Sequence, residues 1–230
     1  MKRKTKIIII FVIILALGSA IAFEKYQDKH TPYKVLAKND LGTVERIIYG
    51  CETSEETLSI ITGMHPREKL SIEPEIEAAK EYANEHSDVK VMHYQVNVTK
   101  DADDYDKGRT NGEKLVHDYV NPDVTRSDAS CVIISHSHAE DYGEGFYLAT
   151  PEMDEASVEI AKKIHATSDF GYYEKTGNEA YQSTSAQLVS CPIAKAGYPT
   201  FVYEVPENIT AQNSTAWTKD LFSLMVKYTS

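Results

Sequence analysis

The pattern of apolar and polar positions along the chain alternates between short strand-like runs and longer helix-like segments. Short apolar or β-branched runs predict strands at residues 44–49, 57–62, 89–98, 131–135 and 200–205. Apolar residues at helical spacing predict helices at residues 74–86, 111–120, 153–167 and 216–228. The alternation of strands and helices implies a sheet that is layered by helices.

A further apolar run, at residues 7–23, follows a hexapeptide that contains four cations and no acid. A basic flank orients such a run with its N-terminus in the cytoplasm. Its 17 residues are at the short end of what spans a bilayer, and its composition also resembles a cleavable signal peptide. We therefore expect residues 1–23 to be a membrane anchor or a signal peptide. An uncleaved anchor is favoured because the run stays apolar through the cleavage region, and in both cases the remainder lies outside the cytoplasm.

The segment that follows, residues 24–42, is polar, mixed in charge and contains Pro32, which is typical of a linker. Residues 43–230 are then expected to form a single domain, since this length is sufficient for a full hydrophobic core.

Charge and cysteine content narrow the functional classes. The N-terminal hexapeptide holds four of the 24 basic residues and none of the 35 acidic ones, so the rest of the chain has a net charge of −15. Such a surface argues against nucleic acid or an anionic membrane face as a partner. The three cysteines form neither a disulfide framework nor a CxxC metal pattern, and one disulfide between two of them remains open.

Acidic and imidazole side chains stand at the ends of three predicted strands. His65 and Glu68 follow the strand at 57–62, His136 follows the strand at 131–135, and Glu204 lies near the end of the last strand. Functional groups in sheets of this kind gather at the carboxyl ends of the strands. We therefore expect these four side chains to lie close together.

This set of residues matches the chemistry of a catalytic zinc site. Such a site has three protein ligands and a water molecule, whose pKa the metal lowers. His65 and Glu68, three residues apart on a turn, can bind the same ion as His136. Glu204 is then the candidate base, which takes a proton from the zinc-bound water and returns it later.

Residues 62–68, with the sequence TGMHPRE, resemble the G-(I/M)-H-x-R-E zinc motif of the metallocarboxypeptidases. That family shares its fold with the succinylglutamate desuccinylases and aspartoacylases. Its third ligand is a histidine that follows an apolar strand, and His136-Ser137 is similar. Its catalytic glutamate lies in a T-x-x-E strand context, which Thr200 to Glu204 resembles with one additional residue.

The resemblance implies an α/β fold with a mixed, largely parallel central sheet of seven or eight strands and helices on both faces. It also implies Zn²⁺ as cofactor and the hydrolysis of an amide bond. For a protein outside the cytoplasm, the expected substrates are peptides or cell-envelope peptides.

Two departures from the family pattern concern substrate binding. The segment between Glu68 and His136 is short, and the chain lacks the Asn-Arg dipeptide that grips a terminal carboxylate in the digestive carboxypeptidases. Arg109, which we place just before a helix, is the best substitute for the family arginine that polarises the carbonyl, and Arg126 is the second. Tyr181 lies at about the family's distance before the catalytic glutamate, where a mobile tyrosine covers the substrate. The resemblance therefore predicts amide hydrolysis without fixing a preference for a free C-terminus.

Two other interpretations remain open. Residues 134–141 also resemble the H-x-H-x-D-H loop of metallo-β-lactamase-type hydrolases, with His136 and His138 as the pair, although Glu140 and Asp141 stand where Asp and His belong. His138 is in addition an alternative to His136 as the third ligand. The second interpretation is a non-catalytic binding domain that kept the same fold.

Overall fold

The computed structural model describes residues 10–19, 31–140, 142–174 and 183–229. The chain divides into two compact units, Met1–Thr31 and Pro32–Ser230. In the first unit, residues 10–19 are helical and their large apolar side chains are exposed. Residues 7–9 and 20–23 of the expected anchor lie outside the described residues. In the part of the chain that is described, no helix combines the length and apolar character needed to cross a bilayer.

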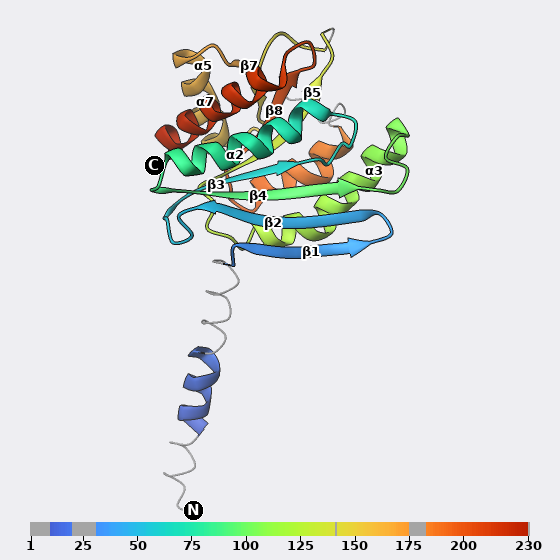
Figure 1. The fold of residues 1–230 in the computed structure, drawn as a ribbon. Coiled ribbons are helices and arrows are strands. Elements are labelled where there is room, and N and C mark those ends of the chain that lie inside the picture. The colour runs from blue at the N-terminus through green and yellow to red at the C-terminus, as the bar shows by residue number, and fades with distance from the viewer. Residues whose placement is uncertain (1–9, 20–30, 141, 175–182, 230) are drawn as a thin grey trace, which may run out of the picture. The chain divides into compact units, whose positions relative to one another are not determined.

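The described residues of the second unit form one eight-stranded sheet with the strand order β1-β2-β4-β3-β5-β8-β6-β7 (Figure 1). The strands are β1 (Tyr33–Asn39), β2 (Gly42–Gly50), β3 (Glu56–Thr62), β4 (Val89–Val98), β5 (Cys131–His138), β6 (Tyr147–Ala149), β7 (Gly171–Tyr173) and β8 (Thr200–Pro206). The four central strands β4, β3, β5 and β8 are mutually parallel, whereas β2 and β6 pair antiparallel with them. The expected mixed, largely parallel sheet is confirmed.

Helices cover both faces of this sheet (Figure 1). One face packs against α2 (Glu73–Glu85), α5 (Glu155–Thr167) and α7 (Ala211–Thr229). The other packs against α3 (Tyr105–Leu115), the π-helical turn η2 (Val116–Val120), α4 (Asn121–Val124), a second π-helical turn η4 (Ala186–Ser190) and α6 (Cys191–Lys195). Successive side chains of β5 alternate between the two cores, with Ile133 in the first and Ile134 in the second. This double burial explains why the strand appears in the sequence as an unbroken apolar run.

The expected linker at residues 24–42 is wrong over its C-terminal part, because Tyr33–Asn39 is strand β1 and the compact unit begins at Pro32 rather than at residue 43. This strand forms an edge of the sheet and buries only Ala37, and its short apolar run lies between Lys34 and Lys38, so it resembles a polar linker in the sequence. Residues 20–30 of the expected linker lie outside the described residues.

The helix expected at residues 111–120 begins earlier, at Tyr105, so Arg109 lies within α3 and not before it. The Asp104 side chain caps this helix by accepting a hydrogen bond from the Lys107 backbone N–H at 2.9 Å. Its first two turns are polar, so the sequence there lacks the apolar periodicity that would predict a helix. All three cysteines are free thiols, so no disulfide joins any two of them.

Helix α2 brings one carboxyl group into the core beneath β5. Glu75 is fully buried, and its Oε1 accepts a hydrogen bond from the Ser135 hydroxyl. Its Oε2 is buried and has no partner among the described residues. Burial raises the pKa of Glu75 well above its ordinary value, against the smaller effect of Ser135. We therefore expect the folded protein to keep this carboxyl protonated at pH values where the unfolded chain releases the proton.

The first prediction follows from this difference in proton binding. Above pH 4.5 the unfolded chain binds fewer protons than the folded protein at Glu75, so folding stability falls as the pH rises. Glu75→Gln keeps the size of the neutral side chain and has no proton to release, so it removes this fall in folding stability with pH. We expect the urea midpoint of the variant to exceed that of the wild type at pH 9, with a gap that narrows toward pH 5.

Glu77→Gln, on the exposed side of the same helix, is the matched control for this measurement. If the urea midpoints of Glu75→Gln and the wild type differed by the same amount at every pH, this would contradict a raised pKa of Glu75 in the folded protein.

Candidate metal centre

The loop after β3 positions the first two candidate ligands. Gly63 has φ of +78°, and a Cβ atom there would lie 2.1 Å from the backbone oxygen of Val96, so the loop passes directly over β4. A turn follows, in which the Glu68 backbone N–H donates to the His65 carbonyl at 3.1 Å. This turn places the two side chains on the same side of the loop, as the spacing in the sequence predicts.

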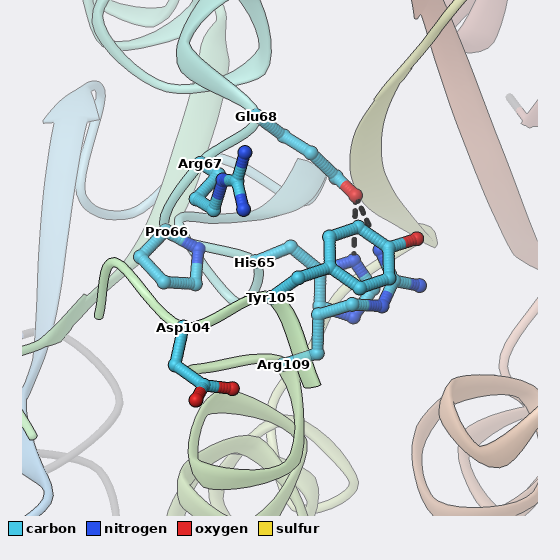
Figure 2. A pocket seen from close by; sticks show the side chains of 7 residues that line it. All are labelled: His65, Pro66, Arg67, Glu68, Asp104, Tyr105 and Arg109. Atoms are coloured by element: carbon cyan, nitrogen blue, oxygen red, sulfur yellow. Dashed lines mark hydrogen bonds and ion pairs between the residues drawn. The ribbon is translucent and has the colours of Figure 1, made fainter. Parts of the chain in front are cut away.

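Glu68 binds both histidines through its two carboxylate oxygens. Its Oε1 lies 2.8 Å from His65 Nδ1, and its Oε2 lies 2.9 Å from His136 Nδ1. The two imidazole rings are 4.4 Å apart between centroids, and all three residues are buried. Figure 2 shows the Glu68 carboxylate directed at the His65 ring.

The donor set of this cluster suits a metal ion. One candidate ligand atom from each of His65, Glu68 and His136 can be chosen so that all lie within 4.8 Å of one another. Two imidazole nitrogens with one carboxylate are the protein ligands of His₂Glu metal sites. The structure therefore brings together the three residues that the sequence analysis named as ligands.

Electrostatic contacts within the cluster shift the pKa values of Glu68 and His65. Burial alone would raise the pKa of Glu68, but the adjacent His136 and His65 lower it far below its ordinary value. Burial alone would lower the pKa of His65, whereas its hydrogen bonds to Glu113 and Glu68 raise it. The lowered pKa keeps Glu68 ionised, and the raised pKa of His65 favours a proton on that ring.

Glu113, on α3, is part of the site and was not identified from the sequence. Its Oε1 lies 3.4 Å from His65 Nε2 and accepts a hydrogen bond from the Thr184 hydroxyl at 3.0 Å. A carboxylate at the second nitrogen of a metal-binding histidine fixes the tautomer and orientation of the ring. Glu113 lies one turn after Arg109 on the same helix face, and this pairing becomes visible only when the helix begins at Tyr105.

Arg109 reaches the centre from the same helix. Its Nη1 donates a hydrogen bond to Glu68 Oε1 at 2.8 Å, and its guanidinium lies 5.3 Å from the centroid of the Tyr105 ring. The Arg67 guanidinium lies 5.8 Å from the same ring. A small cavity of about 20 Å³ opens here, lined by His65, Pro66, Arg67, Glu68, Asp104, Tyr105 and Arg109 (Figure 2).

Glu204 lies beside the cluster on β8. It is the register partner of His136 on the adjacent parallel strand β5, so the two side chains share one face of the sheet. Burial and the negative charge of Glu68 raise the pKa of Glu204 to about 7, against the opposing effects of His136 and Arg109. A carboxyl group that titrates near neutral pH is suited to accept a proton and to return it.

The remaining candidate residues do not join the cluster. The ring nitrogens of His138 lie 3.0 and 2.9 Å from the carbonyl oxygens of Ala139 and Gly145, and His138 is not among the clustered ligands. Arg126 was proposed as a substrate-binding residue, but it is exposed in the turn that precedes β5, at the opposite end of that strand from His136. Tyr181 lies outside the described residues.

No protein-family model matches the sequence, and no curated protein matches it. Among solved structures, the fold is similar to that of a metallo-carboxypeptidase from Burkholderia cenocepacia, with a TM-score of 0.54 and 14% sequence identity. That match covers 92% of this chain and 68% of the other. A second similar structure is the product-bound cell shape determinant protein Csd4 from Helicobacter pylori, with a TM-score of 0.52 and 12% identity. It covers 80% of this chain and 54% of the other.

These similarities show that the protein has the metallocarboxypeptidase-like fold that residues 62–68 led us to expect. At such identities they concern the fold alone. The chain spans about two thirds of the length of the Burkholderia protein and about half that of Csd4.

The second prediction separates the two neighbouring histidines. His136→Ala removes a nitrogen from the cluster, so we expect the metal content of the purified protein, measured after equilibration with Zn²⁺ and desalting, to fall to near zero. His138→Ala removes contacts with two loop carbonyls and with the Tyr147 ring but no clustered ligand, and we expect it to retain the metal content of the wild type. Equal loss of metal in both variants would show that the ligand assignment is wrong.

Proposed function

We propose that the protein is a zinc-dependent amide hydrolase that acts on peptides. The observation that carries this proposal is the buried His65–Glu68–His136 cluster beside Glu204, in a fold similar to that of a metallo-carboxypeptidase. The three clustered residues would hold the ion, and the raised pKa of Glu204 suits the base.

A zinc ion at this position would supply Lewis-acid chemistry, by lowering the pKa of a water molecule and polarising a carbonyl group. The chain's own contribution begins with Glu204, whose carboxylate takes a proton from the attacking water. The same carboxyl then gives a proton to the nitrogen of the leaving amine as the carbon–nitrogen bond breaks. Its pKa near neutrality allows it to act in both directions.

Arg109 is the candidate for stabilising the negative charge that develops on the substrate oxygen. Its guanidinium already lies at the centre, 2.8 Å from Glu68 and over the ring of Tyr105. A fixed cationic donor at the point where an oxyanion forms lowers the barrier because it requires no rearrangement during the reaction.

Peptides, including cell-envelope peptides, are the substrates that we propose. Support comes from the similarity to a metallo-carboxypeptidase and from the N-terminal segment. We also propose that the compact unit acts outside the cytoplasm, either anchored by residues 7–23 or released after their cleavage. The basic hexapeptide followed by an apolar run supports this location.

The third prediction concerns location. Expression of the full chain and of a chain that lacks residues 1–23, each with a C-terminal tag, should place only the former beyond the cytoplasmic membrane. Protease added to intact spheroplasts should then degrade the tagged full chain and spare the truncated one. Protection of both chains would contradict export.

The fourth prediction tests the chemistry itself. Glu204→Gln keeps the size of the side chain and cannot accept a proton, so we expect turnover to fall by about 10²- to 10⁴-fold while bound zinc is retained. The assay is digestion of a peptide library, with and without chelator, read by mass spectrometry. Glu140→Gln, at an exposed carboxylate, is the matched control and should leave turnover unchanged.

The pH profile provides a second measurement. Activity requires ionised Glu204, so the rate should rise with pH through the pKa of this group. A bound cation would lower that pKa, which places the rising limb below pH 7. Full zinc occupancy without any cleavage by the wild type would favour a non-catalytic binding domain.

A further inference from the structure

Tyr147 lies next to Glu204 on the side away from the metal ligands. It is the register partner of Glu204 in the antiparallel pair of β6 with β8, as His136 is in the parallel pair of β5 with β8. Side chains that are directly opposite on neighbouring strands stand about 5 Å apart on the same face of a sheet. His136, Glu204 and Tyr147 therefore form a row across three strands, with the candidate base in the middle.

The ring of Tyr147 is held in a space that two glycines leave open. A Cβ atom on Gly143 would lie 2.5 Å from Cε1 of the ring, and one on Gly171 would lie 2.8 Å from Cβ of Tyr147. The imidazole of His138 packs on the ring, with 5.1 Å between centroids. These contacts fix Tyr147 on a strand, so its hydroxyl has a defined position relative to Glu204.

The hydroxyl of Tyr147 is a hydrogen-bond donor that faces the candidate site without a partner in the described part of the chain. Within the described residues it makes no hydrogen bond, although the side chain is only partly exposed. Burial, and then the charge of Glu204, raise the pKa of Tyr147, so the phenol stays neutral and protonated. Tyr142 and Tyr173 lie close enough to influence this pKa, and both rings are exposed.

We propose that Tyr147 binds the amine side of the substrate, by donating a hydrogen bond to an oxygen acceptor on the leaving amine. This inference rests on the proposed function, in which Glu204 protonates that amine. A hydroxyl beside Glu204 is placed to reach the atoms attached to the leaving nitrogen. The expected substrate class is therefore an amide whose amine part is an amino acid or a peptide, with a carbonyl adjacent to the α-carbon, rather than a simple alkylamine.

Two probes that differ only in the group that carries this acceptor provide the test. In N-acetyl-alanyl-alaninamide the amine part carries a carboxamide, and in N-acetyl-alanine isopropylamide a methyl group replaces it. Binding of each to the full-length, zinc-loaded Glu204→Gln protein is measured by calorimetry. We expect the first probe to bind about 3- to 10-fold more tightly, as one hydrogen bond contributes. Adding Tyr147→Phe, which keeps the ring and removes the hydroxyl, should bring this ratio to about 1.

Tyr33→Phe in the same protein is the matched control, because the Tyr33 hydroxyl donates to Glu45 on the outer strands of the sheet. It should preserve the ratio, and all variants should keep the zinc content and melting temperature. A ratio of about 1 with Tyr147 intact, or a ratio that survives Tyr147→Phe, would overturn the proposal. Calorimetry needs no turnover, so absence of hydrolysis by the wild type would count against the proposed function and leave this ratio to decide the role of Tyr147.

Discussion

The site depends on the contacts that the buried carboxylate of Glu68 makes with its three neighbours. It contacts His65, His136 and Arg109, which come from three separate elements: the loop after β3, strand β5 and helix α3. A carboxylate removed from water is costly unless it is surrounded by positive charge and hydrogen-bond donors. These partners offset that cost only if the loop, the strand and the helix all converge on it. The same convergence brings Glu113 behind His65 and leaves Glu204 beside His136.

The sheet makes this convergence precise because its central strands are packed on both faces. Strand β5 directs His136 toward Glu68 in the candidate metal centre, while the preceding Ser135 points into the opposite core and binds Glu75 of α2. A strand fixed in this way has little freedom to slide or tilt. Side chains carried on rigid strands are held more closely than side chains on loops. Apolar packing of the sheet therefore fixes the positions of the side chains in the candidate site.

The sequence allowed the central strands, the mixed sheet and the three candidate ligands to be predicted, because each depends on local patterns. An apolar run identifies a buried strand, and residues 62–68 carry a compact motif. The contact of Glu113 with His65 joins residues 48 positions apart, and no local sequence pattern indicates it. Arg126 was misplaced for a related reason, since an arginine in a loop does not reveal which end of the sheet its loop occupies. Tyr147 lies on a three-residue strand, too short for any periodicity.

Gly112 allows α3 to pack closely against the loop that carries His65. A Cβ atom at this position would lie 1.7 Å from the carbonyl oxygen of Met64, one residue before His65. Any larger residue would push the helix away from the loop and carry Arg109 and Glu113 with it. The positions of Arg109 and Glu113 at the candidate site therefore depend on a glycine that has no side chain to contact His65, Glu68 or His136. In remote homologues, a glycine three residues after the helical arginine would be a diagnostic character, useful where the short zinc motif alone is ambiguous.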